Sequence, residues 1–534
     1  MAAVEPRRRT VSLKPPRMPD YGAPRPFERL PRWAQAGVVL AALLAISAFI
    51  RSRLLGGVLW YTEANAVGIA SHPLRQIPGL LRHGGGAPLY YLLLHLWIEA
   101  FGVGESAVHG LSLLFGLLAV PAAMWVGWTL WGRRAGVMAA TLVAFSSFLT
   151  VYAGEARPYE LLTLLGLLAL GGLLHGFVYR RRAWLWLLGA TLALMLYTDD
   201  WAVFFFAGAA FATAAIWALS EERRGFARDA ALVFGLAALA YLPWLPTVVY
   251  QAFHATDPFH YAPQLGATVP RNLLGSDRTW VTLGLAAVAG LLPLLLAPRV
   301  RTPEGRAVVA LAVLILAALS IARLASFLAP AWASRYMGPV AAAFLLLAAL
   351  GCARSGVLGL IAVLLACAFT AHSGAVLPAQ KSDMSEIAAE LSPYLRAGDE
   401  VLVLAPEQTP LAFYYLPGGL HYATPFGPDP HPSWTDWDGA YARLRGAQPS
   451  RVAARLLAGL RPGQRLLVIR PLTAGEKAWS LPWAQLVRRR AAQWGALLAS
   501  DPQLSQVPGA WAPQTYQTLN PCCIDSSALV YEKR

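Results

Sequence analysis

The chain has 534 residues, of which 57% are hydrophobic and only 14% are charged, and its formal net charge is +15. This composition is too apolar for a typical water-soluble globular protein and favours a protein embedded in a lipid bilayer. The arginines form short clusters between apolar runs instead of one continuous surface, which argues against a nucleic-acid partner and for charges that set membrane orientation.

The first 33 residues are rich in arginine and proline and contain no apolar core. They also lack the small-residue cleavage site of a secretory signal peptide. We expect residues 1–33 to form a disordered, basic tail in the cytoplasm.

Eleven apolar runs follow, most of them close to the roughly 20 helical residues that cross a bilayer core. They lie near residues 35–53, 107–131, 136–152, 159–178, 183–198, 201–219, 229–248, 280–297, 307–328, 335–351 and 355–375. The arginine clusters are Arg7 to Arg9, Arg133 and Arg134, Arg180 to Arg182, Arg223 with Arg224 and Arg228, Arg299 with Arg301 and Arg306, and Arg354. All of these clusters lie on one side of the bilayer if every run spans it, and basic residues mark the cytoplasmic side. The sequence therefore predicts an all-α, multi-pass protein of the plasma (inner) membrane, with about eleven transmembrane helices over residues 34–375 and a cytoplasmic N-terminus.

The stretch 88–101, PLYYLLLHLWIEAF, is apolar but short. At about 1.5 Å per residue it does not reach across a bilayer core of about 30 Å. We expect an interfacial helix with Tyr90, Tyr91 and Trp97 in the headgroup zone. The alternative, a tilted span, would invert every later loop.

The composition changes after residue 375, where a helix-like stretch, a Gly-Asp turn and the short strand VLVLA are followed by a second such unit, GLRPGQRLLVIRP. This pattern is typical of a small soluble α/β domain over residues 376–534. An odd number of preceding spans places that domain outside the cytoplasm. Its Tyr414, Tyr415, Trp434 and Trp437 fit either a glycan-binding surface or a hydrophobic core.

Charged side chains gather in the predicted outer loops. Glu63 in the first loop, residues 54–106, is the leading candidate for a catalytic base, and a merely solvated carboxylate is the alternative. In the second loop, Glu155 and Arg157 precede Tyr159 at a helix start, where they could ligate a cation, grip a phosphate or form a local ion pair.

Asp199 and Asp200 follow at the third outer corner and should face a polar cavity, because an unpaired charge is costly in lipid. The fourth loop, residues 250–280, has enough polar side chains for a lid, and a plain surface loop is the alternative. In the fifth loop Arg335, next to Tyr336, either forks onto a phosphate or reaches to a lipid headgroup.

No metal or nucleotide motif is evident. The histidines of the first loop, at 72, 83, 95 and 109, do not repeat at a metal-binding spacing, which disfavours zinc. Gly84 to Gly86 lack the following Lys-Ser/Thr of a phosphate loop. Cys352 and Cys367 lie in apolar runs, and the adjacent Cys522 and Cys523 are expected to be unpaired or separately paired, a strained vicinal disulfide being the alternative.

Six segments, in chain order, resemble those of GT-C glycosyltransferases of the family 39 and aminoarabinose-transferase type. They are LWYTEANAV, GGGAPLYYLLLHLWIEAFG, YAGEARPYELL, LYTDDWAVF, YLPWLP and SRYMGPV, and they run from about Tyr61 to Pro339. The resemblance implies a GT-C-like membrane enzyme that takes a sugar from a polyprenyl-phosphate donor and transfers it, with inversion, to an acceptor hydroxyl outside the cytoplasm. The acceptor would be a lipid, a glycan or a protein.

The resemblance also implies roles for single residues. Glu155 and Arg157 resemble residues near the active site of that family, and Glu155 and Tyr159 are candidates to contact the substrate or a metal. Our hypothesis is that Arg335, with Arg157 and Tyr336, binds the donor phosphate. A divalent cation, Mg²⁺ or Mn²⁺, could assist the leaving phosphate, but no cofactor is established by the sequence.

The first motif departs from the family pattern, in which an Asp-Glu pair follows the aromatic residue, because this chain has Thr62-Glu63. Glu63 is the first choice for the base, and Asp199, Asp200 or Glu155 is the second. A non-catalytic glycan- or lipid-binding scaffold and a lipid or sugar transporter are the competing functions. The transferred sugar, hexosyl as in mannosyltransferases or pentosyl, stays open between mannose, glucose, arabinose and galacturonic acid.

Overall fold

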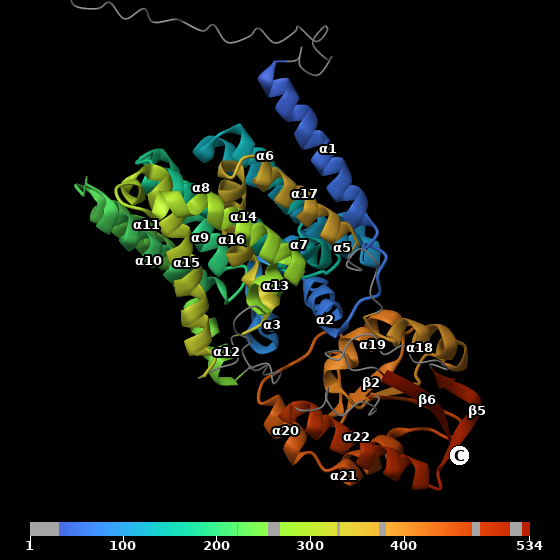
Figure 1. Ribbon diagram of the computed structural model, residues 1–534. Coiled ribbons are helices and arrows are strands. Elements are labelled where there is room, and N and C mark those ends of the chain that lie inside the picture. The colour runs from blue at the N-terminus through green and yellow to red at the C-terminus, as the bar shows by residue number, and fades with distance from the viewer. Residues whose placement is uncertain are drawn as a thin grey trace, which may run out of the picture.

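The structure is a computed structural model that describes residues 31–221, 223–254, 268–327, 332–372, 381–471, 481–512 and 526–534. It consists of a bundle of long helices and a C-terminal domain built on a sheet (Figure 1). Most of the predicted N-terminal tail, Cys522 and Cys523, and residues 255–267 of the predicted fourth loop lie outside the described residues.

Each predicted apolar run coincides with helix. By length and composition, seven described helices could cross a membrane on their own: α1 (Arg32–Ser52), α5 (Glu105–Trp131), α8 (Tyr159–Leu173) with its extension η2 (Leu174–Val178), α10 (Ala202–Leu219), α14 (Asp277–Leu295), α15 (Pro303–Ala325) and α16 (Gly338–Arg354) with the preceding η5 (Ser334–Met337).

The other four predicted runs are bent or short. Two are helix pairs, α6 (Arg133–Ala144) with α7 (Ser147–Ala153) bent by 47°, and α11 (Phe226–Tyr241) with α12 (Leu245–His254) bent by 63°. The last two are the shorter apolar helices α9 (Leu185–Leu196), preceded by η3 (Arg182–Trp184), and α17 (Val357–His372). The described chain is therefore an all-α, multi-pass membrane fold with a separate α/β part.

Glycines let several of these helices approach closely. A Cβ atom on Gly136 of α6 would lie 2.7 Å from Cβ of Trp128 in α5, and one on Gly351 of α16 would lie 2.5 Å from Cα of Ala287 in α14. Helices in a bilayer associate through such close packing because lipid offers little hydrophobic drive for helix association.

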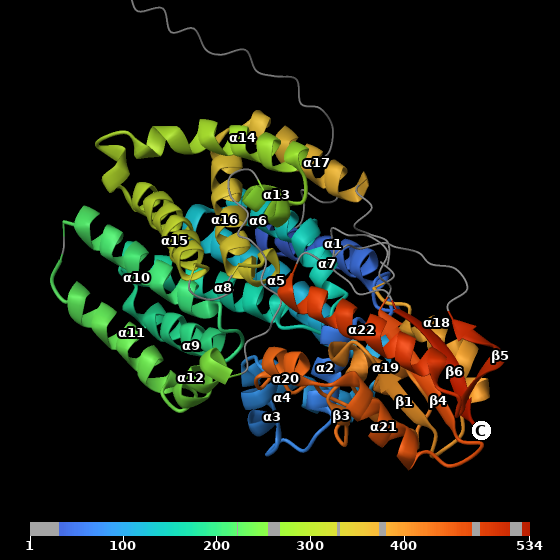
Figure 2. The ribbon, with the colours of Figure 1, turned by 90° about the horizontal axis from the view of Figure 1, so that it is seen from below.

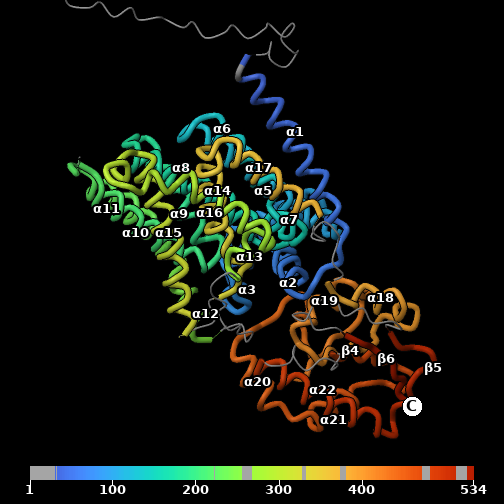
Figure 3. Tube along the Cα trace, viewed as in Figure 1, coloured from blue at the N-terminus to red at the C-terminus, as the bar shows by residue number. Residues whose placement is uncertain are grey.

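The segment between α1 and α5 forms three short helices, α2 (Tyr61–Ala70), α3 (Ile77–Gly84) and α4 (Pro88–Phe101). Pro88 opens α4, and Gly102, with φ 83°, ends it. The predicted helix is confirmed, but Tyr90 and Tyr91 face the protein interior. Both are buried, and the Tyr90 hydroxyl lies 3.1 Å from Ser112 Oγ of α5. Figure 3 shows α2 and α3 between the bundle and the C-terminal domain.

Among the described C-terminal residues, six strands form one sheet in the order β3-β2-β1-β4-β6-β5 (Figure 2). The strands are β1 (Glu400–Val403), β2 (His421–Thr424), β3 (Gly427–Pro428), β4 (Arg465–Pro471), β5 (Leu504–Ala512) and β6 (Ser526–Lys533). β1 pairs in parallel with β2 and β4, and the remaining pairs are antiparallel. The two strands predicted from the sequence are β1 and β4, which lie side by side.

Both faces of the central strands β1 and β4 are covered, so these strands are apolar on both sides. Leu402 and Val468 face α21 (Pro449–Gly459) and α22 (Pro482–Ser500), whereas Val401 and Leu467 join the core that continues into the bundle. That second face carries α18 (Met384–Leu391) and α19 (Thr409–Tyr415), and α19 packs on α2.

The four aromatic residues with two predicted roles lie at this junction or in the core. The Tyr414 hydroxyl donates to the Val103 carbonyl at 2.7 Å, and the Tyr415 hydroxyl accepts from Leu59 N at 2.8 Å. Trp434 packs against the core partly buried, and Trp437 is buried against Trp483.

Candidate active site

Segments that are far apart in the sequence bring most of the predicted residues together. The Arg157 guanidinium, in the loop between α7 and α8, donates to the Thr62 carbonyl at 3.4 Å and to the Tyr159 hydroxyl at 3.2 Å. The Tyr159 ring is 5.8 Å from that of Tyr336, which in turn packs against the Arg335 guanidinium. The first, second and fifth predicted outer loops therefore share one site.

Asp199, in the turn between α9 and α10, belongs to the same electrostatic environment, because the charges of Arg157 and Arg335 act on its carboxyl group. Asp200 differs from it. Its side chain is exposed, and within the described part of the chain it makes no hydrogen bond or ion pair with the other candidate residues.

Glu63 is completely buried and accepts hydrogen bonds from four groups. Its Oε2 accepts from Trp60 N at 3.1 Å, and its Oε1 accepts from Ala156 N at 2.9 Å. His109 Nε2 lies 2.8 Å from Oε1, and Lys381 Nζ lies 2.9 Å from Oε2. The bond to Trp60 N follows from the sequence, because a glutamate at the third position of a helix reaches back to the amide of the capping residue.

Burial opposes the ionisation of Glu63, but the charge of Lys381 and the contact with His109 outweigh it and lower the pKa of Glu63 to about 2. The group is therefore an enclosed carboxylate at neutral pH.

Glu63 and Lys381 together hold the short loop that carries Glu155. Lys381 Nζ donates to the carbonyl of Gly154 at 2.6 Å, and the amide of Ala156 donates to Glu63. The peptide groups on both sides of Glu155 are thus fixed by the same ion pair. We call this arrangement the loop clamp.

The loop clamp also contacts the C-terminal domain. Next to Lys381, Ser382 Oγ donates to the Leu59 carbonyl at 2.8 Å, just ahead of α2. Asp383 Oδ2 accepts from the amide of Ser526, the first residue of β6, at 3.1 Å. Three consecutive residues therefore connect the sheet to the loop that carries the candidate site.

Two carboxyl groups of the site are less constrained than Glu63. Glu155 is partly exposed, and its Oε2, although itself covered, accepts no hydrogen bond from the described residues. Burial raises the pKa of Glu155 to about 7, against the charge of Lys381, and the nearby Glu63 carboxylate acts in the same direction as burial. Burial, with the charge of Asp200, likewise raises the pKa of Asp199 to about 7. Either group can exchange a proton near neutral pH.

The two guanidinium groups have neutral partners. Arg157 contacts the hydroxyls of Tyr159 and Tyr91, and Arg335 donates to the Tyr336 hydroxyl at 3.3 Å. Arg335 Nε is buried without a hydrogen-bond partner, and within the described residues no carboxylate lies within 4.0 Å of either side chain. Two arginines without counter-ions form a site for an anion, and their forked geometry suits a phosphate.

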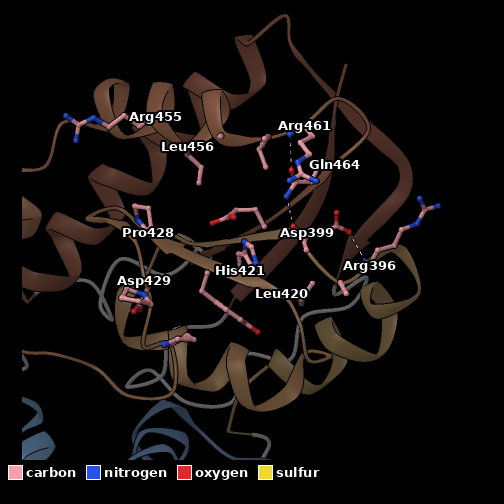
Figure 4. Close-up of a pocket in the computed structure, with 18 of the residues that line it drawn as sticks. Arg396, Asp399, Leu420, His421, Pro428, Asp429, Arg455, Leu456, Arg461 and Gln464 are labelled. Atoms are coloured by element: carbon pink, nitrogen blue, oxygen red, sulfur yellow. Dashed lines mark hydrogen bonds between the residues drawn. The ribbon is translucent and has the colours of Figure 1, made fainter.

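A cavity among the described residues is separate from this site. It has a volume of about 1200 Å³ and lies in the C-terminal domain, where it is lined by residues such as Glu400, His421 and Pro428. Figure 4 shows His421 pointing into it, whereas the guanidinium groups of Arg396 and Arg455 point away. None of the candidate residues lines this cavity.

Sequence reasoning missed Lys381 and the contact of His109 with Glu63. A signal was available for Lys381, because lysine occurs only four times in this arginine-rich chain, at 14, 381, 477 and 533. For His109 there was none, because its partner Glu63 lies 46 positions away with no periodic relation.

No protein-family model matches the chain, and no curated protein matches it in sequence. Solved structures do match. ArnT from Cupriavidus metallidurans bound to undecaprenyl phosphate superimposes with a TM-score of 0.60 at 14% identity, over 94% of this chain and 98% of that chain. The apo state of the same protein gives 0.59.

This chain has the GT-C fold. The arabinofuranosyltransferase AftD from Mycobacteria is also similar, with a TM-score of 0.51 at 16% identity, over 94% of this chain and 42% of that chain. At these identities the likeness establishes the fold alone, and it agrees with the order of motifs along the chain. The GT-C fold and the described site together support the proposal that follows.

Proposed function

We propose that this GT-C protein is a membrane glycosyltransferase that transfers a sugar from a polyprenyl-phosphate donor to an acceptor hydroxyl on the non-cytoplasmic side, with inversion. The observation that carries the proposal is the pair Arg157 and Arg335, which form no ion pair within 4.0 Å among the described residues and lie near carboxyl groups that can take up a proton near neutral pH. The likeness to a structure with bound undecaprenyl phosphate supports the choice of donor.

The donor phosphate would lie against Arg157 and Arg335. Negative charge builds up on this phosphate as its bond to the sugar breaks, and fixed positive charges in a poorly solvated site stabilise that change most effectively. The hydroxyls of Tyr91, Tyr159 and Tyr336 hold the two guanidinium groups without neutralising them. Tyr336 and Tyr159 are therefore proposed as residues of the donor site.

The sequence predicts Glu63 as the base. We instead assign the base to Glu155. The Glu63 carboxylate is fully enclosed and already accepts from four groups. Glu155 is partly exposed and has an oxygen without a bond, and a pKa near the working pH is the most effective for proton transfer. Glu63 would then act through the loop clamp, and Asp199 is the second choice for the base.

In the proposed reaction Glu155 accepts the proton of the acceptor hydroxyl while that oxygen forms a bond to the anomeric carbon. The bond from this carbon to the phosphate oxygen breaks on the opposite face, and the electron pair leaves with the polyprenyl phosphate. One displacement inverts the anomeric centre. Which sugar is transferred, hexosyl or pentosyl, is set by contacts beyond these residues.

A transfer assay tests this function. The protein in nanodiscs receives a panel of polyprenyl-phosphate sugars and a crude envelope acceptor fraction, and label transfer is compared between the wild type, Glu155→Gln, Glu63→Gln and Glu99→Gln. Glu99 is an exposed carboxylate of α4 and serves as the matched control.

We expect transfer by the wild type and by Glu99→Gln, and loss of most activity with donor binding retained in Glu155→Gln. We expect Glu63→Gln to lower thermal stability together with activity. Full activity of Glu155→Gln would show that the base is assigned wrongly. Donor binding without any transfer would favour a scaffold, and sugar or lipid uptake into proteoliposomes would favour a transporter.

A further inference from the structure

A second cluster of potential ligands lies outside the candidate active site, where three parts of the chain meet. His83 is in the last turn of α3, and Asp436 and Asp438 lie in the loop before α20 (Ala440–Gly446). One ligand atom from each of these three side chains lies within 4.8 Å of the other two. Figure 2 shows α3, α12 and α20 near one another at this corner.

The two oxygens of the Asp438 carboxylate differ in their hydrogen bonds. Its Oδ2 lies 2.5 Å from His83 Nδ1 and accepts from the Tyr250 hydroxyl of α12 at 2.6 Å. Its Oδ1 is covered and accepts no hydrogen bond from the described residues. A covered carboxylate oxygen without a partner is costly, and a cation ligand bond would satisfy it.

Two backbone hydrogen bonds hold the cluster together independently of the three side chains. Trp437 N donates to the His83 carbonyl at 3.0 Å, and Gly439 N donates to the His254 carbonyl at 2.9 Å. Asp438 N donates to Asp436 Oδ1 at 2.9 Å, which fixes the turn between the two aspartates. The backbone that carries the three side chains is therefore set before any ligand binds, which lowers the entropic cost of binding.

We propose that His83, Asp436 and Asp438 bind a divalent cation of the zinc class, which fastens the C-terminal domain to the loop between α1 and α5. A mixed set of imidazole nitrogen and carboxylate oxygen suits Zn²⁺ better than the all-oxygen sites of Mg²⁺ and Ca²⁺. Tetrahedral bonds of about 2.1 Å place ligand atoms about 3.4 Å apart, so His83 Nδ1 and Asp438 Oδ2, which lie 2.5 Å apart, would separate by about an ångström. The fourth position is open to water.

Arg443 is the group that opposes this site, because its guanidinium donates to Asp436 Oδ2 at 3.2 Å. That side chain is 39% exposed, so it can turn into solvent when a cation takes its place. The proposal does not depend on glycosyl transfer, since none of these residues belongs to the candidate active site.

The test measures metal content and affinity in the full-length protein in nanodiscs. After chelation and dialysis against Zn²⁺, or against Co²⁺ as a spectroscopic probe, we expect about one tightly bound equivalent per chain. In His83→Gln and Asp438→Asn the affinity should fall at least 100-fold, while Asp438→His, which keeps a ligand, should retain most of it. The matched controls are His72→Gln in the same loop and Asp429→Asn in the same domain, and both should bind like the wild type.

A second measurement, amide hydrogen exchange, tests whether the cation holds the C-terminal domain to the loop between α1 and α5. Added Zn²⁺ should slow amide exchange at residues 436–439 in the wild type and leave exchange in Asp438→Asn unchanged. Two results would overturn the proposal. One is equal metal binding by the wild type and both ligand variants, and the other is no binding by the wild type at about 100 µM free Zn²⁺. The cluster would then be a hydrogen-bonded His-Asp pair.

Discussion

The loop clamp makes a quantitative prediction for Lys381→Met, which keeps the length of the side chain and removes its charge. The Glu63 side chain is completely buried and that of Lys381 is 16% exposed, so the variant leaves a buried carboxylate with the bonds from Trp60, Ala156 and His109 only. Removing one partner of a buried ion pair is destabilising because the remaining charge is uncompensated.

The magnitude follows from the pKa of Glu63, which is about 2 in the folded protein against an ordinary 4.5. At about 1.4 kcal/mol per pKa unit this difference corresponds to about 3 kcal/mol of stabilisation of the carboxylate. Of the contributions that lower this pKa, the charge of Lys381 is the largest and that of His109 the next, so we expect the variant to lose about 2 kcal/mol. The double variant Glu63→Gln/Lys381→Met should recover part of the loss, because it leaves no buried charge.

Thermal unfolding followed by tryptophan fluorescence, at several pH values, measures this effect. Because the pKa of Glu63 is lowered by folding, its stabilising contribution is present above pH 4.5 and is lost as the pH falls towards 2. The difference in Tm between the wild type and Lys381→Met should be largest near pH 7 and should narrow below pH 4.5. Lys533→Met, which removes an ammonium that donates to the Leu457 carbonyl, is the control. A gap that stays constant from pH 7 to pH 3.5 would refute the reasoning, since Lys381 would then act through packing.

Three further outcomes follow from the geometry. The transfer rate of the wild type should rise as the pH increases through about 7, because Glu155 must lose its proton to act as a base, and Glu155→Gln should be about 10²- to 10⁴-fold slower with a flat pH profile. Arg335→Met should slow transfer by about 10²-fold and weaken donor binding. Arg335→Lys should recover donor binding more than transfer rate, because lysine keeps the charge but lacks the forked guanidinium. Equal rates for all three proteins would remove Arg335 from the donor site. Gly116→Ala should lower the free energy of unfolding by about 1–3 kcal/mol. The new Cβ would lie 2.8 Å from Arg51 Nη1 and 2.9 Å from Glu160 Oε2, two buried groups inside the bundle. An unchanged Tm would show that the Arg51 and Glu160 side chains can move apart freely.

The helical segments could be predicted because lipid imposes a simple rule on sequence. A chain that crosses a bilayer must pair all its backbone groups within a helix and present apolar side chains over about 20 residues. Where the structure describes them, all eleven runs contain helix. Seven of these helices, or nine spans if the bent pairs α6–α7 and α11–α12 each count as one, are long and apolar enough to cross a membrane. The strands β1 and β4 were also evident, because strands buried on both faces form continuous apolar runs.

The burial of single side chains was not predictable in the same way. Tyr90 and Tyr91 have the composition of an interfacial belt, yet both face the protein interior. Which side of a short apolar helix meets the protein depends on its neighbours, here α2 and α5, and not on the helix alone.

In the candidate site, too, some features could be predicted from the sequence and others could not. The sequence by itself determined which chemical groups are present: carboxylates and arginines at the ends of apolar runs, where an ionised side chain can be tolerated. Only the tertiary structure decided which of these groups are buried and which partners they have. Glu63 is enclosed because Lys381, 318 positions later, folds back onto it. Among the described residues, the hydrogen bonds that Arg157 and Arg335 make to other side chains go to phenols and not to carboxylates. Charge and burial depend on atoms a few ångströms away in space, and those atoms come from segments whose contacts no local pattern records.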